Sequence, residues 1–148
     1  MKRILISTAI SLVMTTIVWS HNVTTNTVEK APITVKQLAK TTKSWNGATL
    51  PAYQKGQPEV TILRISIEPN AKLPIHEHPV INAGVLLKGE LTVHTLSGKT
   101  LKMKAGDPIV ECVDTWHYGA NEGTNVAEII VFYAGITNEL VTIKKKQK

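Results

Sequence analysis

Two histidines separated by one residue are the first feature of this sequence that could support chemistry. His76 and His78 flank Glu77. In an extended segment alternate side chains point to the same face, so both imidazoles would share one face and Glu77 would lie on the other. Pro74 and Pro79 stiffen the segment from both sides. Two imidazoles at this spacing can share one metal ion, but a third ligand is required.

The other histidines are the candidates for that third ligand. His21 lies in an Asn- and Thr-rich leader, and His94 falls on the polar face of a predicted strand. His117 follows the predicted strand 109–113 in a turn-rich stretch. On the sequence alone, His117 is the best of the three.

Alternating apolar and polar residues indicate the elements that must position these side chains. The predicted strands cover residues 60–67, 73–78, 81–87, 90–96, 100–104, 109–113 and 126–133. Short strands separated by turn signals are typical of a β-sandwich or β-barrel. Residues 35–43 could form one short helical turn or a strand, and no helical period follows them. The sequence therefore predicts a single all-β domain.

The region around the paired histidines resembles the first motif of the cupin superfamily. Three residues separate His78 from Asn82, and six separate Asn82 from Gly89, which is the family spacing. The family carries Glu at the position of Asn82. The glycine that usually opens the motif is absent, and Asn70 is its nearest equivalent.

A second stretch resembles the second cupin motif. Gly106, His117 and Asn121 fall at the family positions. Cys112 stands where the family has proline, and Asp114 stands where it has glycine. The two motifs occur in the family order, which makes the resemblance specific for the fold.

The resemblance covers about residues 60–134 and implies a cupin jelly-roll barrel with one divalent transition metal ion. It implies His76, His78 and His117 as ligands, with Asn82 as a weak fourth ligand or none. Three neutral ligands favour Fe(II), Zn, Ni or Cu over Mn, which prefers carboxylates. The alternative is a metal-free structural or ligand-binding cupin whose histidines make hydrogen bonds in a polar cavity.

Two classes of function are compatible with such a metal site. The first is a non-catalytic cupin that binds the metal and a small molecule such as a sugar or an organic acid, and the missing motif carboxylate favours it. The second is a three-histidine, dioxygenase-like oxidoreductase, because three neutral ligands leave adjacent positions on an octahedral ion. Glu111 and Asp114 are its candidate acid or base residues.

The net charge of +6 over 148 residues comes from the two ends of the sequence. Residues 1–20 contain Lys2 and Arg3 and then an uncharged, mostly apolar stretch, the pattern of a secretory signal peptide. The tail 144–148 contains four further lysines, which leaves 11 basic residues against 11 acidic residues in between. A neutral body excludes the electrostatic footprint of a nucleic-acid-binding protein.

The predicted organisation is a signal peptide at 1–20, a leader and N-terminal arm at 21–58, a cupin barrel at 59–136, and a C-terminal strand and basic tail at 137–148. Cleavage would give a periplasmic or secreted protein without a membrane span, the alternative being a retained N-terminal anchor. The expected partners are a small molecule and a second copy of the chain in a homodimer formed through sheet edges. The single cysteine, Cys112, is expected to be buried.

Overall fold

The computed structural model describes residues 32–146, and none of these residues is helical. Val35–Lys148 form one compact unit. Its strands are β1 (Pro58–Ile67), β2 (His76–Glu77), β3 (Ile81–Lys88), β4 (Glu90–Thr95), β5 (Thr100–Lys104), β6 (Pro108–Val110), β7 (His117–Ala120), β8 (Ala127–Ile136) and β9 (Ile143–Lys144). The predicted all-β fold is therefore confirmed. No helix of the described residues is long and apolar enough to cross a membrane.

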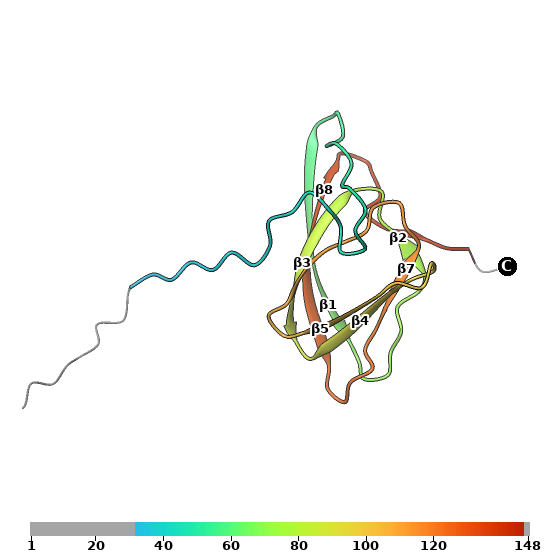
Figure 1. The fold of residues 1–148 in the computed structure, drawn as a ribbon. Helices are drawn as coiled ribbons and strands as arrows, with labels where there is room; N and C mark the ends of the chain where they lie inside the picture. The colour runs from blue at the N-terminus through green and yellow to red at the C-terminus, as the bar shows by residue number, and fades with distance from the viewer. Residues whose placement is uncertain (1–31, 147–148) are drawn as a thin grey trace, which may run out of the picture. The chain divides into compact units, whose positions relative to one another are not determined.

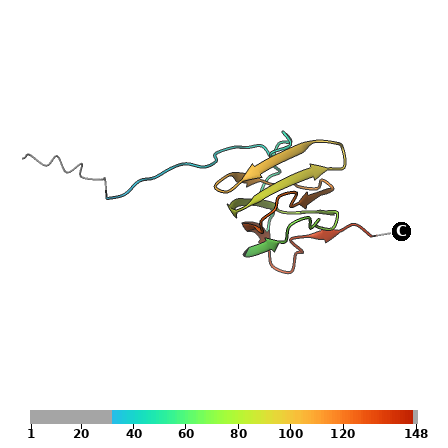
Figure 2. The same cartoon turned by 90° about the horizontal axis from the view of Figure 1, so that it is seen from below.

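The strands form two antiparallel sheets (Figure 1). One sheet has the order β1-β8-β3-β6, and the other has the order β5-β4-β7-β2-β9. Most neighbours within a sheet are distant in sequence, as in the pairing of β1 with β8 from Pro58↔Ile136 to Ile67↔Ala127. Figure 2 shows the same domain from below, with its strands running across it one beside another. This arrangement is that of a jelly roll.

The hydrophobic core lies between the sheets, because the strands alternate inward apolar and outward polar side chains. The four-stranded sheet contributes Leu86 and Val131, and the five-stranded sheet contributes Val93 and Met103. Burying one such side chain stabilises the fold by about 1.5–3 kcal/mol. The two sheets thus enclose an interior that is packed with apolar side chains from both of them.

Strand β1 departs from its expected pattern at one end. Leu63, Ile65 and Ile67 alternate on one face, as predicted, but burial rises along that face: Ile67 is 2% exposed, whereas Leu63 is 38% exposed. Leu63 borders an opening of the interior rather than the packed core. The shared face of the three residues is therefore as predicted, and its burial decreases from Ile67 toward Leu63.

Residues 35–43 form neither a helical turn nor a strand, so both alternatives are wrong; Lys43 alone pairs, with Thr49, in an isolated bridge. The turn glycines of the two motifs have a structural explanation. Gly89 and Gly106 have φ angles of 73° and 92°, a region that favours glycine. A Cβ atom on Gly89 would also lie 2.6 Å from the carbonyl oxygen of Val126. Gly89 lies between β3 and β4, and Gly106 lies between β5 and β6, so both turns carry the chain from one sheet to the other.

Candidate metal centre

The structure brings His76, His78 and His117 together. Strands β2 and β7 place His76 directly opposite His117, and His78 follows β2 and pairs with Val113 in an isolated parallel bridge. The candidate ligand atoms of the three histidines all lie within 4.8 Å of one another. The ring centroids are 4.5–5.1 Å apart. This is the clustering that the spacing of the two motifs implies.

Backbone carbonyls orient all three imidazoles in the same way. Each Nδ1 donates a hydrogen bond of 2.7 Å, His76 to Pro74, His78 to Val141 and His117 to Thr115. A carbonyl oxygen can only accept, so the proton must be on Nδ1. Each neutral ring therefore carries its free lone pair on Nε2. Fixing the tautomer from the far side of the ring is the usual support for a metal-binding histidine.

Burial keeps the three rings neutral. It lowers the pKa of His78 from 6.5 to about 4 and also lowers the pKa values of His76 and His117. The Nε2 atom of His117 is buried and has no hydrogen-bond partner. A buried polar atom without a partner is costly, and a metal ion on this lone pair would remove that cost. The residues present thus fit a divalent transition metal ion.

The C-terminal strand contributes to the site from a distant part of the sequence. Strand β9 pairs with β2 through His76↔Lys144 and Glu77↔Ile143. Just before it, the Val141 carbonyl accepts the hydrogen bond of His78, and the Thr142 hydroxyl lies 3.3 Å from the same Nδ1 atom. Sequence reasoning missed Val141, because a backbone acceptor 63 residues away leaves no signal in residue type.

Glu111 is the carboxylate beside the cluster. It is buried, and its Oε2 atom lies 3.7 Å from Nε2 of His117. Burial raises the pKa of Glu111 from 4.5 to about 7, while nearby His76 opposes this rise. Of the two candidate acid or base residues, the structure places Glu111 at the histidines. Asp114 is exposed, at a φ of 49°, and does not line their cavity.

Asn82 is buried on β3 and is 1% exposed. Its side-chain amide donates to the Val80 carbonyl at 3.2 Å, and its Oδ1 atom is buried without a hydrogen-bond partner. Asn82 does not line the cavity beside the three histidines. Its role as a fourth ligand therefore stays a prediction.

The remaining candidates do not join the cluster. His94 stacks on Tyr118 with ring centroids 4.9 Å apart, and its Nδ1 atom lies 3.1 Å from the Thr100 hydroxyl. His21 lies outside the residues that the structure describes. Cys112 is a buried free thiol, as expected, and burial raises its pKa to about 12.

Two cavities lie beside the three histidines and share some of their lining residues. A small interior cavity of about 40 Å³ is lined by the three histidines, Glu111 and apolar side chains from both sheets. A second cavity of about 150 Å³ shares His76 and His78 with it and is otherwise lined mainly by apolar residues, including Leu63 and Leu73. Lys144 is the cationic side chain on its wall. A small molecule in the second cavity would thus lie against the imidazoles.

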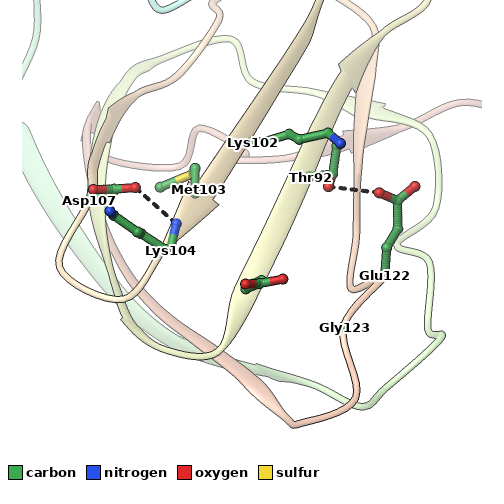
Figure 3. Close-up of a pocket in the computed structure, with 8 residues that line it drawn as sticks. Thr92, Lys102, Met103, Lys104, Asp107, Glu122 and Gly123 are labelled. Atoms are coloured by element: carbon green, nitrogen blue, oxygen red, sulfur yellow. Dashed lines mark hydrogen bonds between the residues drawn. The ribbon is translucent and has the colours of Figure 1, made fainter.

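A larger depression of about 470 Å³ lies elsewhere (Figure 3). Charged side chains from both sides line it, and two of its hydrogen bonds join Thr92 to Glu122 and the Lys104 amide to Asp107, both at 2.9 Å. None of the predicted ligands lies on its wall.

Residues 63–133 match the family model described as "Cupin domain". This segment is a cupin domain. The match includes both motifs and the three clustered histidines. No curated protein matches the chain.

Several solved structures are similar to this cupin chain. A Klebsiella pneumoniae protein with a double-stranded β-helix domain is 17% identical, with a TM-score of 0.52 over 65% of this chain and 90% of that one. An oxalate decarboxylase from Lactobacillus farciminis, solved with formate, is 19% identical, with a TM-score of 0.50 over 57% of this chain and 26% of that one. Both show the fold alone.

An oxalate oxidase solved with the substrate analogue glycolate is 25% identical, with a TM-score of 0.49 over 57% of this chain. The aligned part spans 45% of the length of that oxidase. The cupin chain therefore corresponds to less than half of that protein.

Proposed function

We propose that this cupin binds one divalent transition metal ion through Nε2 of His76, His78 and His117 and presents it to a small-molecule ligand. The observation that carries the proposal is the shared orientation of the rings, each held by a carbonyl on Nδ1. Three neutral lone pairs on clustered, buried rings have a clear use as a metal site.

The donor set favours Fe(II), Zn, Ni or Cu over Mn. Imidazole nitrogens suit these ions, whereas Mn prefers carboxylate oxygen. When bound, the ion would supply Lewis acidity and open positions for a ligand. The protein would hold the rings neutral and exclude bulk water, because burial and the carbonyl hydrogen bonds are already in place.

The cavity of about 150 Å³ is the route that we propose for the ligand. It opens beside Leu63, where β1 is less covered, and it reaches His76 and His78. Its mainly apolar wall favours a small molecule with an apolar body and a polar group directed at the ion.

Metal analysis of the protein purified without an affinity tag tests this function. We expect close to one equivalent of a transition metal, or uptake of one equivalent on addition, and no uptake by the His117→Ala variant. Less than about a tenth of an equivalent, with no uptake on addition, would contradict the proposal, because a metal site in the folded protein takes up its ion.

A metal-dependent oxidoreductase is the second candidate function. The position of Glu111 favours it, because a buried carboxylate 3.7 Å from His117 could hold or move a proton of a bound substrate. Oxygen consumption by the metal-loaded protein, measured against a panel of small organic acids and phenols, separates the candidates. Turnover that disappears in the Glu111→Gln variant would favour the enzyme, and ligand binding without turnover would favour the binding protein.

We further propose that the chain is exported and cleaved near residue 20, and that it forms a homodimer. The signal-peptide pattern supports export, and the unpaired edges of the two sheets support pairing of two copies. The N-terminal sequence and the molar mass of the exported protein in solution test both statements. A retained residue 1 would contradict cleavage, and a monomer at all concentrations would contradict the dimer.

A further inference from the structure

Glu111 reaches the interior through the pairing of two strands. Its backbone amide donates to the Asn82 carbonyl at 3.0 Å, which continues the ladder between β3 and β6 by one residue beyond Ala83↔Val110. Inward side chains alternate along this segment, and Glu111 follows the buried Ile109 at that period. Of the described residues, Glu111 supplies the carboxylate on the wall of the interior cavity.

One oxygen of this carboxylate is available. Oε2 is buried and has no hydrogen-bond partner, although it lies 3.7 Å from Nε2 of His117. The set of ligand atoms that lie within 4.8 Å of one another contains the three imidazoles and not Glu111. The oxygen thus lies beside the cluster on the cavity wall without belonging to its ligand set, where a molecule bound in the cavity would meet it.

The charges around the ion would otherwise be unbalanced. Three neutral imidazoles leave a divalent ion with its full charge in a cavity with mainly apolar walls. A carboxylate a few ångströms away attracts the cation and repels any anion that approaches the open positions, and both effects are strong where water is excluded. It also accepts a hydrogen bond from a neutral molecule that carries a donor.

From this geometry we infer that Glu111 sets the selectivity of the site. It strengthens binding of the metal ion, weakens the binding of anions that the ion and Lys144 on the wall of the second cavity would attract, and accepts a hydrogen bond from a ligand with a hydroxyl or similar donor group. The inference rests on the proposed metal-binding function and adds the chemical class of the ligand.

The test uses Co²⁺ as the metal and azide as a small anion, with the full chain and its Glu111→Gln variant. Loss of the charge should weaken Co²⁺ binding about tenfold or more while one ion is still bound, because residues around a metal site typically change affinity by about 10–100-fold. Azide binding to the Co²⁺-loaded protein should become tighter, by about tenfold, because a nearby negative charge has been removed. The visible spectrum of Co²⁺ reports both equilibria.

The opposite directions of the two changes make the result decisive. A purely structural loss would weaken both equilibria, which would overturn the inference, as would two unchanged affinities. The Glu59→Gln variant, which removes the same charge from an exposed position on β1, should change neither. Absence of Co²⁺ binding to the unmodified chain would instead overturn the proposed metal site, together with the selectivity that depends on it.

Discussion

The interior histidine cluster and the surface depression of Figure 3 show two different ways in which polar groups can gather. The depression is large, at about 470 Å³, and two of its carboxylates accept hydrogen bonds: Glu122 from the Thr92 hydroxyl and Asp107 from the Lys104 amide. The interior cavity is about 40 Å³, yet it contains polar atoms without partners, among them Nε2 of His117 and Oε2 of Glu111.

This difference shows what distinguishes a site from a surface hollow. A protein gives up stability when it buries polar atoms without partners, whereas exposed charges cost little and contribute little. The cluster therefore contains buried polar atoms that a bound group would satisfy, whereas the hydrogen bonds of the depression are made within the protein. Removing groups from each region tests the contrast.

The largest effect is expected from His117→Ala. Loss of one of three imidazole ligands should lower metal affinity by at least about 100-fold, because structural metal sites bind with a large free energy, while the backbone pairing of position 117 with His76 is kept. Titration with Zn²⁺ followed by calorimetry measures it. Unchanged affinity in this variant would show that the ion binds elsewhere.

The pH dependence of stability should distinguish the buried His78 from the histidine outside the cluster, His94. In the metal-free protein the pKa of His78 falls from 6.5 to about 4, so its contribution to stability is present above pH 6.5 and is lost as the pH falls toward 4. A shift of this size corresponds to about 3 kcal/mol in the free energy of unfolding.

Urea unfolding between pH 7 and pH 4 measures this contribution as the difference between the unmodified protein and the His78→Gln variant. The raised pKa of Glu111 acts in the opposite direction in both proteins and cancels in the difference. His94→Gln is the control, since His94 lies outside the cluster. Parallel pH profiles for all three proteins would contradict the account.

Removal of the C-terminal segment should have an intermediate effect. A chain that ends at Glu139 lacks the Val141 carbonyl that orients His78 and lacks β9. We expect metal affinity to fall by about 10–100-fold, the usual effect of losing support around a ligand. A chain that ends at Lys146 keeps these contacts and serves as the control. Equal metal affinity in the two truncated chains would show that β9 has no part in the site.

The smallest effect is expected in the depression. Glu122→Gln removes one charge from its wall and should change stability by less than about 0.5 kcal/mol, as for most exposed substitutions. Metal affinity should not change. Thermal unfolding with and without Zn²⁺ measures both, and a clear loss of metal-dependent stabilisation would remove the contrast between the two regions.

Much of the fold and part of the site could be predicted from the sequence. Alternation placed the strands, and the spacing of the two motifs selected His117 over His94, which the structure confirms by clustering. The sequence offered Glu111 and Asp114 as candidate acid or base residues but could not choose between them, because alternation gives the face of a residue but not which strand lies beside it. The support from Val141 was equally hidden, since it depends on backbone rather than on side-chain identity.

X-ray absorption at the metal edge of the loaded protein identifies the atoms that hold the ion. We expect about three imidazole nitrogens at about 2.0–2.1 Å from one ion, the usual distance for histidine ligands, and one fewer in the His76→Ala variant. A spectrum without imidazole scattering, or one that the His76→Ala substitution leaves unchanged, would contradict the proposed metal site.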